Sequence, residues 1–304
     1  MAAVSLTTSV GRLALRSPLI AASGTVGSVW EWAQIADVRW YGAAVAKSTA
    51  PEKRDGRPAP RMATTSVGML NGVGLQGPGV EAWAAKMAPL IPKLGVPVWG
   101  SAVGADAEAF AQAAAGLAAA GASAVEVNLS CPNEDGLMWS MDPERSASVV
   151  AAAAAAVDVP VGAKLSPNTA DIVAAAAACA EAGADFVVLT NTALGFGASV
   201  ERRKPLLSGG VGGYSGPGLK PLSLRCVYEV HKAMPDLPIV GCGGVVAGRD
   251  VVEYLMTGAS AVEMGTVHLA EPKAGARVRR ELVEVLERLG AAGVDEIVGS
   301  VSEW

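Results

Sequence analysis

The chain has 304 residues and a formal net charge of -5, and 51% of its residues are hydrophobic although only 5% are aromatic. This length suits one large domain or two small ones, and the lack of any linker-like segment favours a single domain over residues 1–304. The acidic balance argues against nucleic-acid binding, because a surface that follows phosphates needs a basic excess. No apolar run approaches the roughly 18–20 residues of a membrane span, and the start does not resemble a signal peptide, so we expect a cytoplasmic protein.

Short apolar segments alternate with helical ones along most of the chain. Strands are predicted, in chain order, near residues 19–22, 43–47, 96–102, 124–128, 161–165, 186–191, 239–243 and 261–265. Alanine tracts favour helix, because alanine loses no side-chain entropy there, and helices are predicted at residues 107–120, 143–157, 170–182, 219–234 and 249–257. Apolar strands separated by helices indicate a parallel sheet that is covered on its outside. Eight such units in about 250 residues predict an α/β fold of the (β/α)₈ TIM-barrel type.

Two segments interrupt this alternation. Residues 49–79 are rich in Pro, Gly and charge, and residues 192–218 are rich in Gly. Both follow predicted strands, so we expect inserted loops on the C-terminal face of the barrel, where loops usually build the site.

Polar residues end six of the eight predicted strands, and in a barrel they would converge on one mouth: Ser23, Lys47, Ser101, Asn128, Lys164 and Asn191. The seventh and eighth strands end instead in Gly243-Gly244 and Gly265-Thr266. Glycines there let backbone N–H groups approach an anion, at the place where barrels commonly bind phosphate. The alternative is that these glycines only permit tight turns.

Lys164 allows three interpretations. A buried lysine at a strand end can be a Schiff-base nucleophile with a lowered pKa, as in barrel aldolases. It can also be a fixed positive charge that stabilises a reduced flavin, or a structural ion pair inside the barrel.

No metal site is predicted from the chain. Its four cysteines are scattered without any Cys-x-x-Cys pair, and its two histidines are His231 and His268. His231 lies in a polar helical stretch and is expected on the solvated surface. Redox chemistry would therefore require an organic cofactor.

The octapeptide at residues 126–133 reads Glu-Val-Asn-Leu-Ser-Cys-Pro-Asn, a strand that ends where a loop begins. Cys131 is placed for chemistry at a sheet rim; a small buried thiol is the alternative. The neighbouring amides of Asn128 and Asn133 suit a heterocycle with alternating N–H and C=O groups.

Several motifs together resemble the class 1 dihydroorotate dehydrogenases. They are Ala-Ser-Gly-Thr at 22–25, Met-Leu-Asn-Gly-Val-Gly-Leu-Gln at 69–76, Asn-Leu-Ser-Cys-Pro-Asn at 128–133, Lys-Leu-Ser-Pro-Asn at 164–168, Asn-Thr at 191–192, Tyr-Ser-Gly-Pro at 214–217 and Gly-Gly at 243–244. The matches run in order across nearly the whole chain.

This resemblance implies an FMN-containing barrel that oxidises dihydroorotate to orotate in pyrimidine biosynthesis. Cys131 would be the base that removes the C5 proton while hydride passes from C6 to flavin N5. The substrate would be bound by Lys47, Asn71, Gly72, Val73, Gly74, Leu75, Asn128, Asn191 and Thr192. FMN would be bound by Ser23, Lys47, Ser48, Ser101, Asn128, Lys164, Thr190, Gly216, Gly243, Gly244, Gly265 and Thr266.

The chain departs from the family pattern at two places. Ser101 stands where the family usually has asparagine, so one flavin hydrogen bond would be shortened or replaced by water. The loop from Glu134 to Trp139 differs from the usual glycine-rich version, which bears on the gating role that this loop has in the family.

The motifs look most like the NAD-linked branch of class 1, which implies a partner subunit that carries FAD and an iron–sulfur cluster, and a homodimeric core. The fumarate-using branch also fits the motifs, whereas a quinone-reducing enzyme is disfavoured because that class has a serine base. Two further hypotheses are a related FMN enzyme acting on another dihydropyrimidine, such as dihydrouracil, and a Schiff-base aldolase using Lys164.

Overall fold

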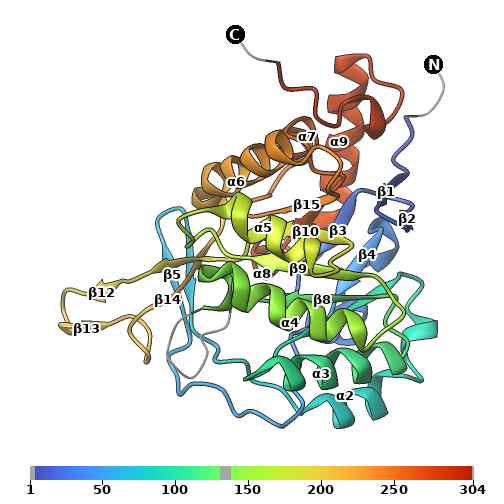
Figure 1. Ribbon diagram of the computed structural model, residues 1–304. Helices are drawn as coiled ribbons and strands as arrows, with labels where there is room; N and C mark the ends of the chain where they lie inside the picture. Colours follow the sequence, from blue (N-terminus) through green and yellow to red (C-terminus); the bar gives the residue numbers. More distant parts are fainter. Residues whose placement is uncertain (1–3, 131–137, 303–304) are drawn as a thin grey trace.

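The computed structural model describes residues 4–130 and 138–302. Its centre is a closed barrel of eight parallel strands (Figure 1), in which the last barrel strand pairs with the first barrel strand. The strands are β3 (Leu19–Ala21), β4 (Ala43–Val45), β7 (Val98–Ala102), β8 (Ala124–Asn128), β9 (Val161–Leu165), β10 (Phe186–Leu189), β15 (Ile239–Cys242) and β16 (Ala261–Met264). The predicted barrel and its eight strands are confirmed.

The strands are mostly apolar because both of their faces are covered. Side chains such as Val45, Trp99 and Phe186 fill the barrel interior, and the Trp99 and Phe186 rings lie 5.2 Å apart. Gly162 makes room for this packing, since a Cβ there would lie 2.2 Å from the Phe186 ring.

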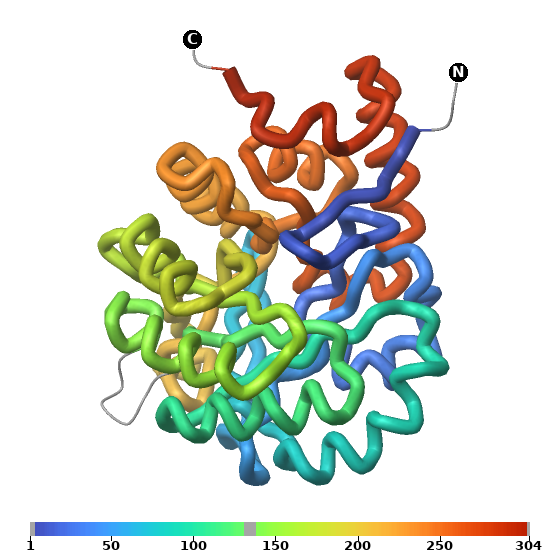
Figure 2. The backbone as a smooth tube through the Cα atoms, turned by 45° about the vertical axis from the view of Figure 1, so that its right-hand side comes forward, coloured from blue at the N-terminus to red at the C-terminus, as the bar shows by residue number. Residues whose placement is uncertain are grey.

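Helices surround the barrel on its outside (Figures 1 and 2). Their bounds are α1 (Trp30–Ala33), α2 (Val80–Met87), α3 (Ala107–Ala119), α4 (Pro143–Ala155), α5 (Ile172–Glu181), α6 (Lys220–Ala233), α7 (Gly248–Met256), α8 (Val267–Ala270) and α9 (Ala274–Leu289). Asp106, Asp142 and Asp171 cap α3, α4 and α5, because each side chain accepts from backbone N–H groups of the first turn. Across residues 4–130 and 138–302, no helix combines the length and apolar character needed to cross a bilayer.

The bottom of the barrel is closed by an N-terminal hairpin that the sequence did not reveal. Strands β1 (Thr8–Val10) and β2 (Leu13–Leu15) are antiparallel, and Val10 and Leu15 pack into the barrel interior. Ser5 bridges Gly293, so the two ends of the chain run beside each other in Figure 2.

The two inserted segments form one small sheet instead of separate loops. Strands β5 (Met62–Thr65) and β6 (Gly68–Asn71) come from the first insert, and β11 (Ala193–Gly195) and β14 (Gly212–Ser215) come from the second. They pair antiparallel in the order β11-β14-β6-β5, with Gly213 opposite Asn71. A further hairpin of β12 (Ala198–Ser199) and β13 (Lys204–Pro205) projects beside this sheet in Figure 1.

Single turns of 3₁₀ helix complete the connections: η1 (Val38–Trp40), η2 (Ile91–Lys93), η3 (Trp139–Met141), η4 (Pro217–Leu219) and η5 (Val294–Glu296).

The expectation that His231 is a solvated surface residue is wrong in part. The ring is half-buried and packs against Gly258 and Gly299, and its Nδ1 has no hydrogen-bond partner among the described residues.

Candidate active site

A cavity of about 900 Å³ opens at the C-terminal ends of the barrel strands, beneath the sheet made by the two inserts. Eighteen of the residues that the sequence assigned to substrate or cofactor line it: Ser23, Lys47, Ser48, Asn71, Gly72, Val73, Gly74, Leu75, Asn128, Lys164, Thr190, Asn191, Thr192, Gly216, Gly243, Gly244, Gly265 and Thr266. The fold therefore brings together side chains that are separated by more than 200 residues in the chain.

Cys131 lies outside the described residues, as does Asn133. Ser130 and Met138, the described residues on either side of that gap, both line the cavity.

Ser101 does not line the cavity. It is fully buried, and its Oγ lies 2.9 Å from Ser48 Oγ, a residue that does face the cavity. The side chain at position 101 therefore acts on the cavity through Ser48.

Ser48 begins a chain of hydrogen bonds that orients the amides of the site. Asn128 Nδ2 donates to Ser48 Oγ at 3.0 Å, and Asn191 Nδ2 donates to Asn128 Oδ1 at 3.1 Å. The backbone N–H of Thr192 then donates to Asn191 Oδ1 at 2.8 Å. Because each amide is held by a neighbour, the remaining donors and acceptors have fixed directions, which a planar polar ligand requires.

The insert sheet covers the opposite side of the cavity. Asn71 Nδ2 donates to Gly213 O at 3.3 Å, which links the two inserts beside the ligand space. Arg57, which the sequence interpretation missed, also lines the cavity, and its Nη1 donates to Val211 O at 3.0 Å. Lys47 and Arg57 thus place two cationic side chains at the cavity wall.

Lys164 is buried at the floor of the cavity. Its Nζ lies 2.5 Å from Glu263 Oε2 and 3.4 Å from Glu126 Oε1. Burial by itself lowers the pKa of Lys164, but the charges of its neighbours raise that pKa above its usual range. The side chain is therefore an ammonium ion, which is the wrong protonation state for a Schiff-base nucleophile.

Glycines form the end of the cavity at β15 and β16. Gly216 and Gly244 have φ values of 101° and 69°, in the left-handed region that favours glycine. A Cβ on Gly244 would lie 2.9 Å from Gly216 O and 2.8 Å from Lys220 N, so the two loops touch backbone to backbone. Lys220 Nζ is paired with Asp250 and Glu253, each at 2.6 Å. This end of the cavity thus offers mainly backbone N–H groups, which suits a phosphate group.

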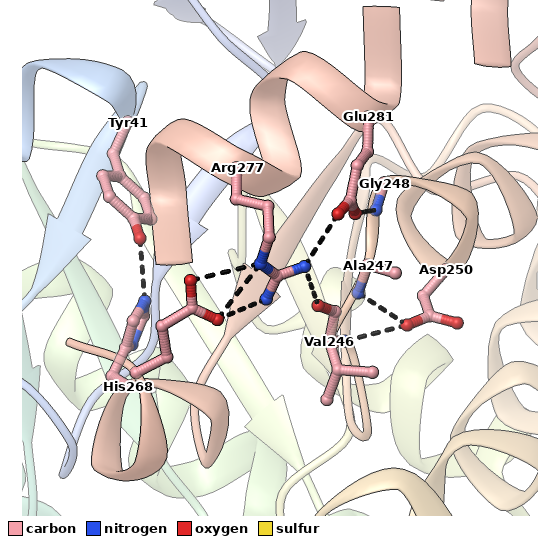
Figure 3. A network of polar contacts seen from close by, with 9 residues as sticks. Tyr41, Val246, Ala247, Gly248, Asp250, His268, Arg277 and Glu281 are labelled. Carbon is pink, nitrogen blue, oxygen red and sulfur yellow. Dashed lines mark hydrogen bonds and ion pairs between the residues drawn. The ribbon is translucent and has the colours of Figure 1, made fainter. Parts of the chain in front are cut away.

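Side chains of α9 hydrogen-bond to the loop that follows Gly244 (Figure 3). Arg277 Nη1 donates to Val246 O at 3.1 Å and to Glu281 Oε1 at 3.0 Å. Glu281 Oε2 accepts from Gly248 N, and Asp250 Oδ2 accepts from Val246 N and Ala247 N. These contacts hold the glycine loop rigidly against the barrel.

A second contact in Figure 3 joins α8 to the segment between η1 and β4. Tyr41 Oη lies 2.9 Å from His268 Nε2. Burial lowers the pKa of His268 to about 4, so the imidazole is neutral at physiological pH. No group of His, Cys, Asp and Glu residues with the arrangement of a metal site occurs within 4–130 and 138–302.

Comparison with known proteins decides the family. The family model for dihydroorotate dehydrogenase matches residues 5–286. The chain belongs to the dihydroorotate dehydrogenase family. It is therefore an oxidoreductase of the family that oxidises dihydroorotate to orotate in pyrimidine biosynthesis, as its motifs predicted, and the aldolase hypothesis is not favoured.

Its relatives point to one branch of this family. The chain is 41% identical over 293 residues to the catalytic subunit of dihydroorotate dehydrogenase B (NAD(+)) from Maridesulfovibrio salexigens, covering 95% of this chain and 96% of the relative. The subunit of the same name from Desulforudis audaxviator is 40% identical over 294 residues, covering 96% and 95%. That from Anoxybacillus flavithermus is 39% identical over 290 residues, covering 94% and 93%. The predicted resemblance to the NAD-linked branch of class 1 is confirmed.

Two residues of the site were missed although the sequence contained a signal for them. Glu126 and Glu263 are charged residues inside otherwise apolar strands, and each stands two positions before a strand-end residue assigned to the site, Asn128 and Gly265. Residues at i and i+2 share one face of a strand. The same spacing therefore places both glutamates on the interior face of the barrel.

Proposed function

We propose that this protein oxidises dihydroorotate to orotate with an FMN held in the cavity at the C-terminal end of the barrel. The observation that carries the proposal is the convergence there of oriented amides, a buried ammonium and a glycine-lined end in a chain of this family. FMN, when bound, supplies the hydride acceptor.

The residues present fit a flavin mononucleotide. Gly216, Gly244 and Gly265 line one end of the cavity, where backbone N–H groups would bind a phosphate, and Thr266 Oγ1 donates to Ser215 Oγ at the same end. Lys164 supplies positive charge at the floor, where it would stabilise the negative charge of the reduced ring system. Ser48 and Asn128 offer fixed hydroxyl and amide groups to the ring.

The substrate side fits a pyrimidine that carries a carboxylate. The amides of Asn71, Asn128 and Asn191 match the alternating N–H and C=O groups of the ring. Lys47 and Arg57 would bind the carboxylate, since a cation bonded to a carboxylate is a strong and directional contact. Dihydrouracil lacks this carboxylate, so the two cations favour dihydroorotate over the neutral dihydropyrimidine.

Cys131 is proposed as the general base that accepts the C5 proton. Support comes from its motif and from the position of Ser130 and Met138 at the cavity wall. A free thiol has a pKa of about 8.5, so a positioned cysteine can accept a proton close to neutral pH.

We further propose that electrons leave through a separate subunit with FAD and an iron–sulfur cluster and reach NAD, and that the catalytic subunit forms a homodimer. The relatives' names support this, because they specify NAD(+) and a catalytic subunit. In an acceptor assay, oxidation by fumarate without any partner would place the protein in the fumarate-using branch.

The experiment is anaerobic reduction of the purified protein. We expect a yellow protein with one FMN per chain that is bleached by dihydroorotate and not by dihydrouracil. A colourless protein that cannot be reconstituted with FMN would contradict the cofactor, whereas bleaching by dihydrouracil alone would leave the cofactor and contradict the substrate.

A further inference from the structure

Two carboxyl groups and one ammonium share the floor of the cavity. Glu126 on β8, Lys164 on β9 and Glu263 on β16 all point into the barrel, and both glutamates are fully buried. If all three were ionised, the floor would carry a net negative charge directly beneath the ligand space. The other titratable group among them is the thiol of Cys242 on β15, which is neutral because burial raises its pKa.

The oxygen atoms of the two glutamates are unequally paired. Glu263 Oε2 takes the short contact with Lys164 Nζ, at 2.5 Å. Glu263 Oε1 and both oxygens of Glu126 have no hydrogen-bond partner among residues 4–130 and 138–302. An ionised carboxylate only accepts hydrogen bonds, so two ionised neighbours cannot bond to each other. A single proton turns one of them into a donor and gives a hydrogen bond to two of the three oxygens that lack one.

We propose that Glu126 and Glu263 hold one proton between them at neutral pH, that it resides on Glu126, and that its O–H donates to Glu263. Glu263 is then the counter-ion of Lys164, in agreement with its shorter distance from Nζ. Burial first, and then the charge of Glu263, raise the pKa of Glu126 well above its usual range.

The consequence for the reaction rests on the proposed function. With the proton in place, the positive charge of Lys164 is balanced by one carboxylate instead of opposed by two. The floor is neutral before reduction, so the ammonium can respond to negative charge that develops above it. Glu126 and Glu263 are positioning residues that act through Lys164.

The first test is infrared difference spectroscopy of the protein as purified, in H₂O and D₂O at neutral pH. We expect the wild type to show the C=O stretch of a protonated, buried carboxyl group, and Glu126→Gln to lack it. In Glu263→Gln the band should also disappear, although Glu126 is intact, because Glu126 then ionises to pair with Lys164. A wild-type spectrum without this band, or a band that persists unchanged in Glu263→Gln, would overturn the proposal.

The second test is the pH dependence of unfolding, which does not depend on turnover. The folded wild type keeps a proton that its unfolded chain releases above a pH of about 4.3. The unfolding equilibrium constant of the wild type relative to Glu126→Gln should therefore rise about tenfold per pH unit, up to the pKa of folded Glu126. A purely structural role would shift this ratio by a constant factor.

Glu284→Gln on α9 is the matched control, because Glu284 is an exposed glutamate outside the barrel floor, and its loss should shift the ratio by a constant factor only. A flat ratio for Glu126→Gln would show that Glu126 is ionised and would overturn the proposal. Neither test uses dihydroorotate, so their failure leaves the proposed reaction standing, and failure of that reaction leaves the shared proton standing.

Discussion

The glycine-lined end of the cavity is the part of the site most open to a sharp test. In Gly244→Ala the new Cβ would lie 2.8 Å from Lys220 N and 2.9 Å from Gly216 O, both backbone atoms that cannot rotate away. The residue also has a φ of 69°, where an L side chain is strained. The substitution should therefore push apart the two loops that are proposed to bind the phosphate.

The magnitude follows from two separate costs. A non-glycine residue in the left-handed region costs about 1–2 kcal/mol, and overpacking against fixed backbone costs about 1–3 kcal/mol. We expect Gly244→Ala to lower the free energy of unfolding by about 2–5 kcal/mol. We also expect it to weaken FMN binding by a factor of about ten or more, equivalent to about 1.4 kcal/mol.

Gly290→Ala provides the matched control. Gly290 has a φ of 73°, nearly the same as Gly244, but a Cβ there meets no atom within 4 Å. This variant should lose only the backbone cost, about 1–2 kcal/mol, and keep its affinity for FMN. Thermal unfolding and flavin fluorescence titration measure both quantities. If Gly244→Ala unfolds like Gly290→Ala and binds FMN as tightly as the wild type, the proposed phosphate end is wrong.

Three further changes test other parts of the site. Lys164→Met removes the cation at the floor, so the reduction potential of bound FMN should fall in a spectroelectrochemical titration; an unchanged potential would show that Lys164 is only structural. Ser101→Ala removes the hydroxyl partner of Ser48 and should cost about 1 kcal/mol in denaturant unfolding. Its affinity for FMN should change little, because Ser101 does not line the cavity; a large loss of affinity would contradict this placement. Burial lowers the pKa of His268 to about 4. As the pH drops from about 6.5 toward 4, the imidazole therefore binds a proton in the unfolded chain but not in the folded one, and the free energy of unfolding should fall. This loss should reach about 3 kcal/mol relative to His268→Gln, and identical pH profiles for the two proteins would contradict it.

The barrel was predictable because its strands are buried on both faces and stand out as apolar runs. The segments 124–128 and 161–165 are strands with the predicted bounds, and the strand at 98–102 lies within the predicted range of 96–102. The insert sheet was not predictable, since it pairs β6 with β14, and these short segments are about 140 residues apart in the chain. Their composition, rich in glycine, is also typical of loops.

Within the site, the rule that ligands bind at the carboxyl ends of parallel strands located most cavity-lining residues. It placed Ser101 at the cavity as well, whereas the structure puts that side chain behind Ser48. Which of two polar side chains reaches the ligand depends on how far each lies from the mouth of the barrel. The alternation of residues along a strand does not give that distance. The i, i+2 spacing from Asn128 and Gly265 would have placed Glu126 and Glu263 on the interior face of the barrel. Both glutamates were instead predicted only as part of apolar strands.

The proposed mechanism depends most on the thiol of Cys131 as the base. Its direct test is anaerobic stopped-flow bleaching of the flavin by dihydroorotate across pH, in the wild type, Cys131→Ala and Cys131→Ser. We expect Cys131→Ala to keep its bound FMN but to be reduced roughly 100- to 10,000-fold more slowly, the usual contribution of a positioned general base. Cys131→Ser should recover part of the rate at higher pH only. If Cys131→Ala is reduced as fast as the wild type at every pH, the thiol takes no part in the reaction and the proposed mechanism is wrong.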